Sequence, residues 1–246
     1  MTILYRKFLT KLLHDPVGTF KRLVSKQFVE PRKYRVQDDY DAARYWDDRF
    51  ARYGASLQAV GDEGLSADRN AYEYAHAAKI FKNVLRQVWQ GDRTQSRVLE
   101  IGPGLGFYTS LLADLGVRHY VGVDITDRFF PVLVEQYPNF KFVRGDVTQH
   151  PIPGDFDLVI MIDVIEHIVT DEKFKRALHF LDTILVPGGL LVVAPIMSVS
   201  KRHLFHVRFW SKEELQSHLP NFQTVHEAAF REGALMVLRK TNLETQ

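Results

Sequence analysis

The sequence predicts an α/β protein in which a doubly wound, mainly parallel sheet follows an N-terminal helical extension. Beyond residue 90, short apolar runs alternate with helical patterns, whereas the residues before that point show helical and loop patterns. Parallel strands that are buried on both faces read as apolar runs, and each needs a crossover, usually a helix, before the next strand. The first run also ends in three alternating glycines, at the edge where such sheets bind nucleotide-like ligands.

The helical extension contains two expected helices. An aromatic-rich helix is predicted over residues 40–53 and ends near Gly54, because glycine commonly follows the last turn of a helix. Residues 54–70 are rich in glycine and predict a loop, and a long helix follows over residues 70–89. Four aromatic side chains of these helices are candidates for lining a pocket: Tyr45, Trp46, Tyr72 and Tyr74.

The core supplies the expected strands. Five apolar runs lie at residues 97–101, 119–123, 140–144, 156–162 and 189–194. Two strand-like runs near the end of the chain, residues 221–229 and 234–239, flank Gly233 and predict a hairpin. No internal repeat or low-complexity linker divides the chain.

The glycine turn after the first run indicates which ligand the sheet binds. Glu100 is followed by Gly102, Gly104 and Gly106, so the third glycine comes one residue too early for the dinucleotide pattern G-x-G-x-x-G. A carboxylate at Glu100 would repel a pyrophosphate, but it suits a cofactor with a positive charge and an amino group. S-adenosylmethionine, a sulfonium with an amino-acid tail, is such a cofactor.

The turn and four later motifs resemble the class I S-adenosylmethionine-dependent methyltransferases, which have a Rossmann-like fold. The later motifs are a strand ending at Asp124, the sequence Gly145-Asp146-Val147, a strand leading to Asp163, and Leu185-Val186-Pro187-Gly188-Gly189. The resemblance covers about residues 80 to 195. It implies a seven-stranded sheet of order 3-2-1-4-5-7-6 with the last strand antiparallel, and it divides the chain into an N-terminal helical arm and lid (1–79) and a methyltransferase domain (80–246).

The resemblance also implies a set of cofactor-binding residues. Glu100, Gly102, Gly104 and Gly106 would hold the methionine end of S-adenosylmethionine, and Asp124, followed by Ile125, would hold the ribose. Asp146 and Val147 would contact the adenine, while Met161 and Asp163 would lie near the sulfonium. S-adenosylhomocysteine would be the product.

The acceptor site is predicted after the fourth core strand. On a helix, Asp163, Glu166 and His167 would stand at i, i+3 and i+4 and share a face. This face could bind a divalent metal together with His206 or His203, as in small-RNA 3′-terminal 2′-O-methyltransferases, although Asp163 stands where those enzymes usually carry Glu. Alternatively, His167 or His206 is a metal-free general base, or the group only forms structural hydrogen bonds. The candidate catalytic residues are therefore His167, His206 and Asp163, no metal ligand is assigned, and a metal is the less favoured alternative.

These motifs predict transfer of a methyl group to an oxygen, or less often a nitrogen, of a small-molecule acceptor. Two alternatives remain. One is a metal-dependent RNA 3′-terminal 2′-O-methyltransferase, although a nucleic-acid partner is not favoured. The other is a non-catalytic or membrane-peripheral scaffold with the same fold. The sequence does not identify the acceptor or the oligomeric state.

Charge and composition bear on the cellular location of the protein and on its contact with membranes. The chain has 246 residues, a formal net charge of +2 and no cysteine. Nine Lys or Arg residues stand against two acidic residues within residues 1–35, so a basic arm could make weak contact with an anionic membrane surface. Residues 1–13 read as an amphipathic helix, with no secretory cleavage pattern and no apolar run long enough to span a bilayer. A cytoplasmic location is expected.

Overall fold

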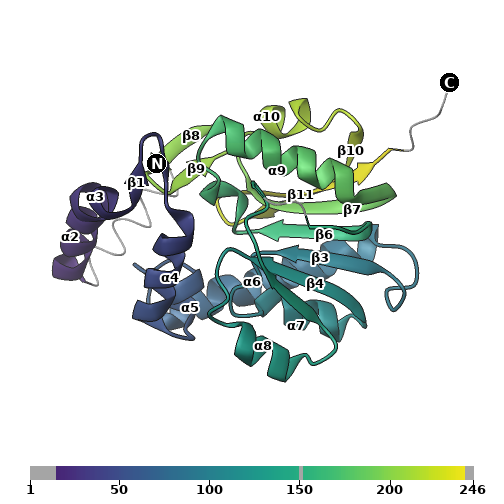
Figure 1. The fold of residues 1–246 in the computed structure, drawn as a ribbon, viewed down its shortest axis with the longest axis horizontal. Helices are drawn as coiled ribbons and strands as arrows, with labels where there is room; N and C mark the ends of the chain where they lie inside the picture. Colours follow the sequence, from purple (N-terminus) through teal and green to yellow (C-terminus); the bar gives the residue numbers. More distant parts are fainter. Residues whose placement is uncertain (1–14, 150–151, 242–246) are drawn as a thin grey trace.

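The computed structural model describes residues 15–149 and 152–241, and its centre is a seven-stranded sheet (Figure 1). The spatial order is β10-β11-β7-β6-β3-β4-β5. These strands are β3 (Arg97–Ile101), β4 (His119–Asp124), β5 (Lys141–Arg144), β6 (Phe156–Ile162), β7 (Leu185–Ile196), β10 (Phe222–Phe230) and β11 (Gly233–Lys240). Numbered along the chain from the opposite edge, the order is 3-2-1-4-5-7-6, with β11 antiparallel to both neighbours. The predicted topology is confirmed.

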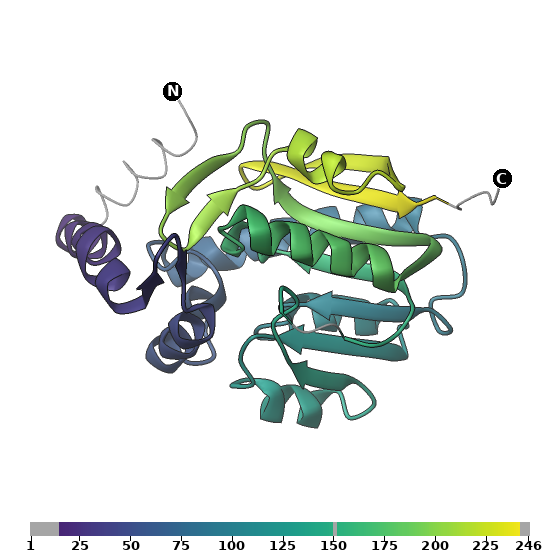
Figure 2. The same ribbon diagram turned by 45° about the horizontal axis from the view of Figure 1, so that its top comes forward.

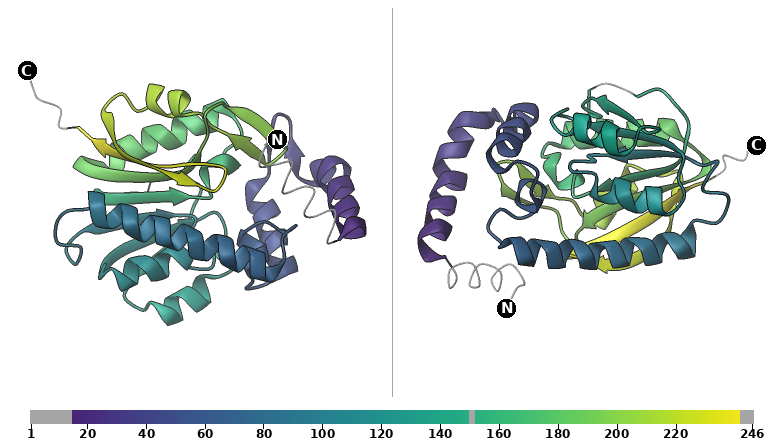
Figure 3. Two further views of the ribbon diagram at one scale, coloured as in Figure 1. Left: turned by 180° about the vertical axis from the view of Figure 1, so that it is seen from behind. Right: turned by 90° about the horizontal axis from the view of Figure 1, so that it is seen from below.

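Helices cover both faces of the sheet, which is why its strands read as continuous apolar runs. On one face, α9 (Asp171–Ile184) and α10 (Lys212–Ser217) pack over side chains such as Leu99 and Val159. On the other face, α6 (Ala67–Val88) and α7 (Phe107–Asp114) pack over side chains such as Val98 and Leu158 (Figure 3). All four of these strand side chains are fully buried. Helix α8 (Phe130–Gln136) completes the crossover between β4 and β5.

The helices before the sheet differ in detail from the sequence prediction. Helix α6 begins at Ala67 because the Ser66 hydroxyl accepts a hydrogen bond from the backbone N–H of Arg69 and caps the helix. The segment predicted as a loop also contains a short helix, α5 (Leu57–Val60). Helix α6 spans the predicted boundary at residues 79 and 80, so the extension and the core share one continuous helix.

The N-terminal arm lies at one end of the molecule, apart from the sheet and beside α4 (Figures 1 and 2). It comprises α2 (Pro16–Val24), a π-helical segment η1 (Ser25–Val29), α3 (Glu30–Tyr34), and a two-stranded pair, β1 (Arg35–Val36) and β2 (Asp39–Tyr40). Helix α4 (Ala42–Tyr53) follows directly. The helix predicted over residues 1–13 lies outside the described residues. None of the described helices is long and apolar enough to span a membrane.

Two smaller elements complete the end of the molecule that carries α4. The turn after β6 contains a 3-10 helix, η2 (Ile165–His167). A two-stranded hairpin of β8 (Lys201–Leu204) and β9 (Val207–Phe209) follows β7, and β9 contacts η2. The sequence predicted a connection here rather than a hairpin.

Candidate functional site

A cavity lies at the carboxyl ends of the parallel strands, under α4. Its floor includes the glycine turn after β3, and its walls carry the side chains of Asp124, Asp146, Asp163 and His167. The aromatic side chains of Trp46 and Phe50 on α4, together with Tyr74 on α6, also line it. Ligands of open α/β sheets bind at this edge because the strand order reverses there.

The glycine turn brings bare backbone against the cavity. Gly102 and Gly104 both have positive φ angles, of 73° and 51°. A Cβ atom on Gly102 would lie 2.3 Å from Val164 Cγ2, so a side chain cannot be accommodated there without displacement. Both residues line the cavity as predicted, whereas Gly106 does not. Gly106 is the N-cap of α7, and a Cβ there would meet Leu133 Cδ2 at 2.5 Å, so this glycine serves helix packing.

Asp124 ends β4 with a carboxylate that is buried beside the cavity. Its Oδ2 accepts a hydrogen bond from the backbone N–H of Gly104 at 3.1 Å, and its Oδ1 accepts one from Thr126 at 3.1 Å. Burial raises the pKa of Asp124 to about 6, because desolvation outweighs these backbone hydrogen bonds. Each oxygen keeps a lone pair for a ligand hydroxyl. Ile125, the next residue, also lines the cavity.

Asp146 stands on the same edge, after β5. Its Oδ1 accepts hydrogen bonds from the backbone N–H and the hydroxyl of Thr148, at 2.9 and 2.7 Å, and its Oδ2 accepts one from Gln149 Nε2. The turn therefore holds the carboxylate against the cavity wall. The buried side chain of Val147 lines the cavity beside it and supplies an apolar surface for a flat ring.

Glu100, which was expected to contact the ligand, does not line the cavity, and its carboxylate is hydrogen-bonded between α7 and β4. Its Oε2 accepts hydrogen bonds from the hydroxyls of Thr109, at 2.7 Å, and Tyr120, at 2.5 Å. The residue is 1% exposed. Burial raises the pKa of Glu100 to about 7, against the opposing effect of the two hydroxyl donors.

This raised pKa predicts a pH-dependent stability. The unfolded chain loses the Glu100 proton near pH 4.5 and the folded chain near pH 7, so the folded state loses stability as the pH rises through this window. Glu100→Gln should remove this dependence, which amounts to about 3 kcal/mol at most. Urea unfolding at pH 5 and pH 8 measures it. The loss of stability between the two pH values should be smaller in Glu100→Gln than in the original protein, and equal losses would contradict the assignment.

The sequence predicted that Asp163, Glu166 and His167 share one helical face. The segment after β6 does not place them on one face. Asp163 lies before η2, in the left-handed region with φ of 58°, and η2 is a 3-10 turn. The neighbouring Ile165 is fully buried in the core and ties the turn to the sheet. The three side chains consequently have separate environments.

Asp163 is held by a partner that the sequence analysis missed. Arg231, in the turn between β10 and β11, donates a hydrogen bond to Asp163 Oδ2 at 2.5 Å. Its guanidinium also lies over the Tyr74 ring, 5.2 Å from the centroid. A turn residue distant in the sequence gives no local signal for this contact.

Glu166 does not line the cavity. Burial, and then the charge of Asp163, raise the pKa of Glu166 well above its ordinary value. A neutral, buried Glu166 and an Asp163 that is paired with Arg231 do not form a set of metal ligands. Among the described residues, no group of three or more His, Asp or Glu side chains could hold a metal ion.

His167 does line the cavity, with its ring against the edge of Trp46 at 4.8 Å between centroids. Its Nδ1–H donates to the backbone carbonyl of His206 at 2.9 Å. Since a carbonyl oxygen only accepts, Nδ1 carries the hydrogen and Nε2 keeps its lone pair. Burial lowers the pKa of His167 to about 4, so the ring is neutral at neutral pH. Its Nε2 lone pair is therefore available to accept a hydrogen bond from an acceptor hydroxyl.

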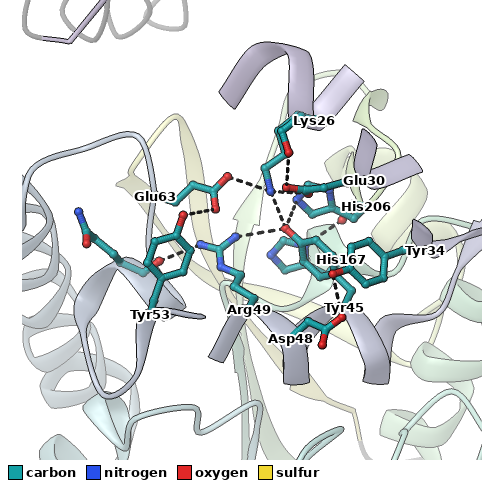
Figure 4. Close-up of polar contacts among 12 residues, drawn as sticks. Lys26, Glu30, Tyr34, Tyr45, Asp48, Arg49, Tyr53, Glu63, His167 and His206 are labelled. Carbon is teal, nitrogen blue, oxygen red and sulfur yellow. Dashed lines mark hydrogen bonds and ion pairs between the residues drawn. The ribbon is translucent and has the colours of Figure 1, made fainter. Parts of the chain in front are cut away.

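His206, a candidate catalytic residue, does not line the cavity. It lies in a network of polar contacts with Tyr45, Lys26 and Glu30 (Figure 4). Its Nε2 lies 3.0 Å from the hydroxyl of Tyr45, which in turn accepts a hydrogen bond from Lys26 Nζ at 2.8 Å. Lys26 also pairs with Glu30 and Glu63, at 2.9 Å each. Burial lowers the pKa of His206 well below its ordinary value. The β8–β9 turn holds His206 in this buried network, and its carbonyl fixes the orientation of His167.

The remaining candidates divide between the cavity and the core. Met161 is fully buried in the core and does not line the cavity. Side chains alternate along β6, and the neighbouring Ile162 is the residue that lines the cavity. Trp46 and Tyr74 line the cavity as predicted, while Tyr45 lies behind it and Tyr72 is 60% exposed. His203 is exposed on the hairpin, stacked on Phe209.

Two further cavity residues were not anticipated. Tyr40, on β2, donates a hydrogen bond to the backbone carbonyl of His167 at 3.1 Å. Lys173, in the first turn of α9, pairs with Asp39 at 2.7 Å. Both side chains line the cavity, and these contacts tie the β1–β2 pair to its rim.

Known proteins match the core of this chain. Residues 99–193 match a family described as methyltransferase domain. An uncharacterized methyltransferase of Alkaliphilus oremlandii is 26% identical over 133 residues, which are 53% of this chain and 61% of that protein. A malonyl-[acyl-carrier protein] O-methyltransferase of Haemophilus ducreyi is 29% identical over 129 residues, 49% of each chain. The chain thus spans between about half and three fifths of the length of these curated relatives.

A solved structure matches over a larger part of the chain. The N1-methyltransferase of Burkholderia thailandensis that binds 1,6-didemethyltoxoflavin and S-adenosylhomocysteine superimposes with a TM-score of 0.58 at 17% identity. The match covers 84% of this chain and 94% of that one. Residues 99–193 therefore match a methyltransferase domain, and the strand order is that of the Rossmann-like fold of the solved methyltransferase.

Proposed function

We propose that this protein transfers the methyl group of S-adenosylmethionine to a hydroxyl oxygen of a small-molecule acceptor. The observation that carries this proposal is the arrangement of one cavity, which has the glycine turn and two strand-end carboxylates at one side and the free Nε2 of His167 at the other. The matched proteins include both an O-methyltransferase and an N-methyltransferase, so the choice of oxygen rests on the neutral histidine.

The cavity residues fit the cofactor. Asp124 has one free lone pair on each carboxylate oxygen for the two ribose hydroxyls, and its burial leaves it without competing solvent. The bare backbone at Gly102 and Gly104 allows close approach of the methionine portion. Val147 and Ile125 supply apolar surface for the adenine, with Asp146 beside them for its amino group. S-adenosylhomocysteine would leave the same site.

The chemistry required of the protein is modest, because the sulfonium of the bound cofactor activates the methyl carbon for in-line displacement. The protein must orient the acceptor and remove its proton. The bound cofactor would supply the methyl group to the acceptor oxygen, and Nε2 of His167 would take the proton of the acceptor hydroxyl. The His206 carbonyl, which accepts from Nδ1–H, stabilises the imidazolium that results. Trp46, Phe50 and Tyr74 limit the access of water to this end of the cavity.

Asp124→Ala tests the cofactor part of the proposal. Removing a carboxylate that binds both ribose hydroxyls should weaken S-adenosylmethionine binding at least tenfold, because hydrogen bonds to charged groups contribute about 1.5 to 3 kcal/mol. Isothermal titration calorimetry measures the affinity. Asp114→Ala, at the far end of α7 and exposed, is the matched control and should bind normally. Equal affinities for Asp124→Ala and the original protein would reject the site.

The geometry does not favour the alternative of a metal-dependent RNA methyltransferase. Its expected ligands are separated: Asp163 pairs with Arg231, Glu166 is buried, and His206 faces Tyr45. Methyl transfer to a panel of phenols and catechols, with labelled cofactor, would support the small-molecule proposal. Transfer to RNA alone would contradict it.

A further inference from the structure

The N-terminal arm from Pro16 to Val36 exposes six large apolar side chains, and no other part of the described chain covers them. Its exposed side chains are between 51% and 65% accessible and comprise Val17, Phe20, Leu23, Phe28, Val29 and Val36. Val17 and Phe20, at i and i+3 of α2, lie on one face of that helix, and Leu23 extends the face by a further turn. Large apolar side chains that gather on a surface mark an interaction site.

This arm is attached to the body by its other side, through polar contacts. The buried ammonium of Lys26 joins η1 to Glu63, in the segment before α6, and to Tyr45 on α4. Tyr34 is buried against Phe205 and donates a hydrogen bond to Asp48. These contacts fix the arm to the body, while the face of α2 that carries Val17, Phe20 and Leu23 stays exposed.

The charges around this face select the partner. Residues 16–36 contain six Lys or Arg residues and a single acidic residue, Glu30, which is buried with Lys26. Lys21, Arg32 and Arg35 are exposed. A cationic rim around an apolar face is complementary to a surface that has anionic groups outside and hydrocarbon beneath.

We infer that the arm from Pro16 to Val36 docks on an anionic lipid bilayer. Phe20 and Leu23 enter the headgroup boundary, while Lys21 and Arg35 remain at the level of the phosphates. The arm lies on the surface of the bilayer, since none of the described helices is long and apolar enough to cross one. Because Lys26 joins the arm to the α4 segment that lines the cavity, docking holds that end of the molecule near the lipid.

Vesicle co-sedimentation of the full-length protein tests this inference without any assay of methyl transfer. Vesicles of phosphatidylcholine mixed with phosphatidylglycerol should bind the protein at least tenfold more strongly than phosphatidylcholine alone, and added salt should weaken the binding. Absence of binding to the anionic vesicles, or equal binding to both compositions, would overturn the inference.

Two paired variants locate the contact. Phe20→Asp with Leu23→Asp should reduce binding at least tenfold, whereas Val132→Asp with Val134→Asp, which are exposed apolar residues on α8, should leave it unchanged. Lys21→Glu with Arg35→Glu should likewise weaken binding, whereas Lys79→Glu with Arg86→Glu on α6 should not. Thermal melts confirm that the variants fold.

Two results would reject the assignment of this face to lipid. One is full vesicle binding by the Phe20→Asp, Leu23→Asp variant. The other is a dimer, detected by analytical ultracentrifugation, that the same two substitutions dissociate, because a second copy would then occupy the face.

Discussion

His167→Ala should slow methyl transfer to a hydroxyl acceptor by about 10²- to 10⁴-fold, the range that positioned general bases contribute. The variant removes the free Nε2 from the cavity but leaves the glycine turn, Asp124 and Asp146 in place. Binding of S-adenosylmethionine should therefore be unchanged in calorimetry. Steady-state kinetics with labelled cofactor measure the loss, which should appear in kcat.

Two comparisons sharpen this result. His167→Gln keeps a polar side chain of similar size but cannot accept a proton, so it should be nearly as slow as His167→Ala. His119→Ala, on the exposed start of β4, is the matched control and should retain full activity. A His167→Ala enzyme with an undiminished rate would reject the general base and leave a nitrogen acceptor with a free lone pair as the better proposal.

The pH dependence of the original enzyme follows from the same group. The base must be neutral, and the pKa of His167 is lowered to about 4 by burial. At saturating cofactor, this histidine should therefore cause kcat to fall only as the pH drops toward 4, rather than near 6.5 as for an ordinary histidine.

The second large effect concerns stability. Lys26→Met should destabilise the protein by about 3 kcal/mol, because it leaves the buried carboxylate of Glu30 and the largely buried one of Glu63 without their shared cation. Although burial disfavours the ammonium, Tyr45, Glu63 and Glu30 together raise the pKa of Lys26 above its ordinary value. Urea unfolding monitored by circular dichroism measures the change in the free energy of unfolding.

Matched variants separate the ion network from simple loss of a lysine. Lys21→Met, exposed on the same arm, should change the free energy of unfolding by less than about 0.5 kcal/mol. Combining Lys26→Met with Glu30→Gln and Glu63→Gln should recover much of the loss, because the unpaired charges are then absent. Equal effects of the Lys26→Met and Lys21→Met substitutions would show that the network contributes nothing.

The sequence determined the sheet and one side of the cavity. The apolar runs, the glycine turn and the acids at Asp124 and Asp146 are local patterns, because strand burial and tight turns depend on adjacent residues. They predicted the strands, and the resemblance to which they point implied the strand order, which the structure confirms. Gly102 and Gly104 line the cavity. Met161 and Glu100 show the limit of such patterns. Both belong to correctly predicted strands, yet the face on which each side chain lies depends on how the sheet packs.

Only the tertiary structure decided the acceptor side. The sequence treated His167 and His206 as equal candidates, and the fold separates them: one lines the cavity, while the other is buried behind it against Tyr45. Asp163 was expected near the sulfonium, on one face with Glu166 and His167, and the fold pairs it with Arg231, 68 positions later. These contacts join elements that are far apart in the chain, and no local pattern encodes them. The glycine turn, by contrast, needs only its own backbone to form, so its position after the first core strand could be predicted from the sequence, whereas the contacts of His167, His206 and Asp163 could not.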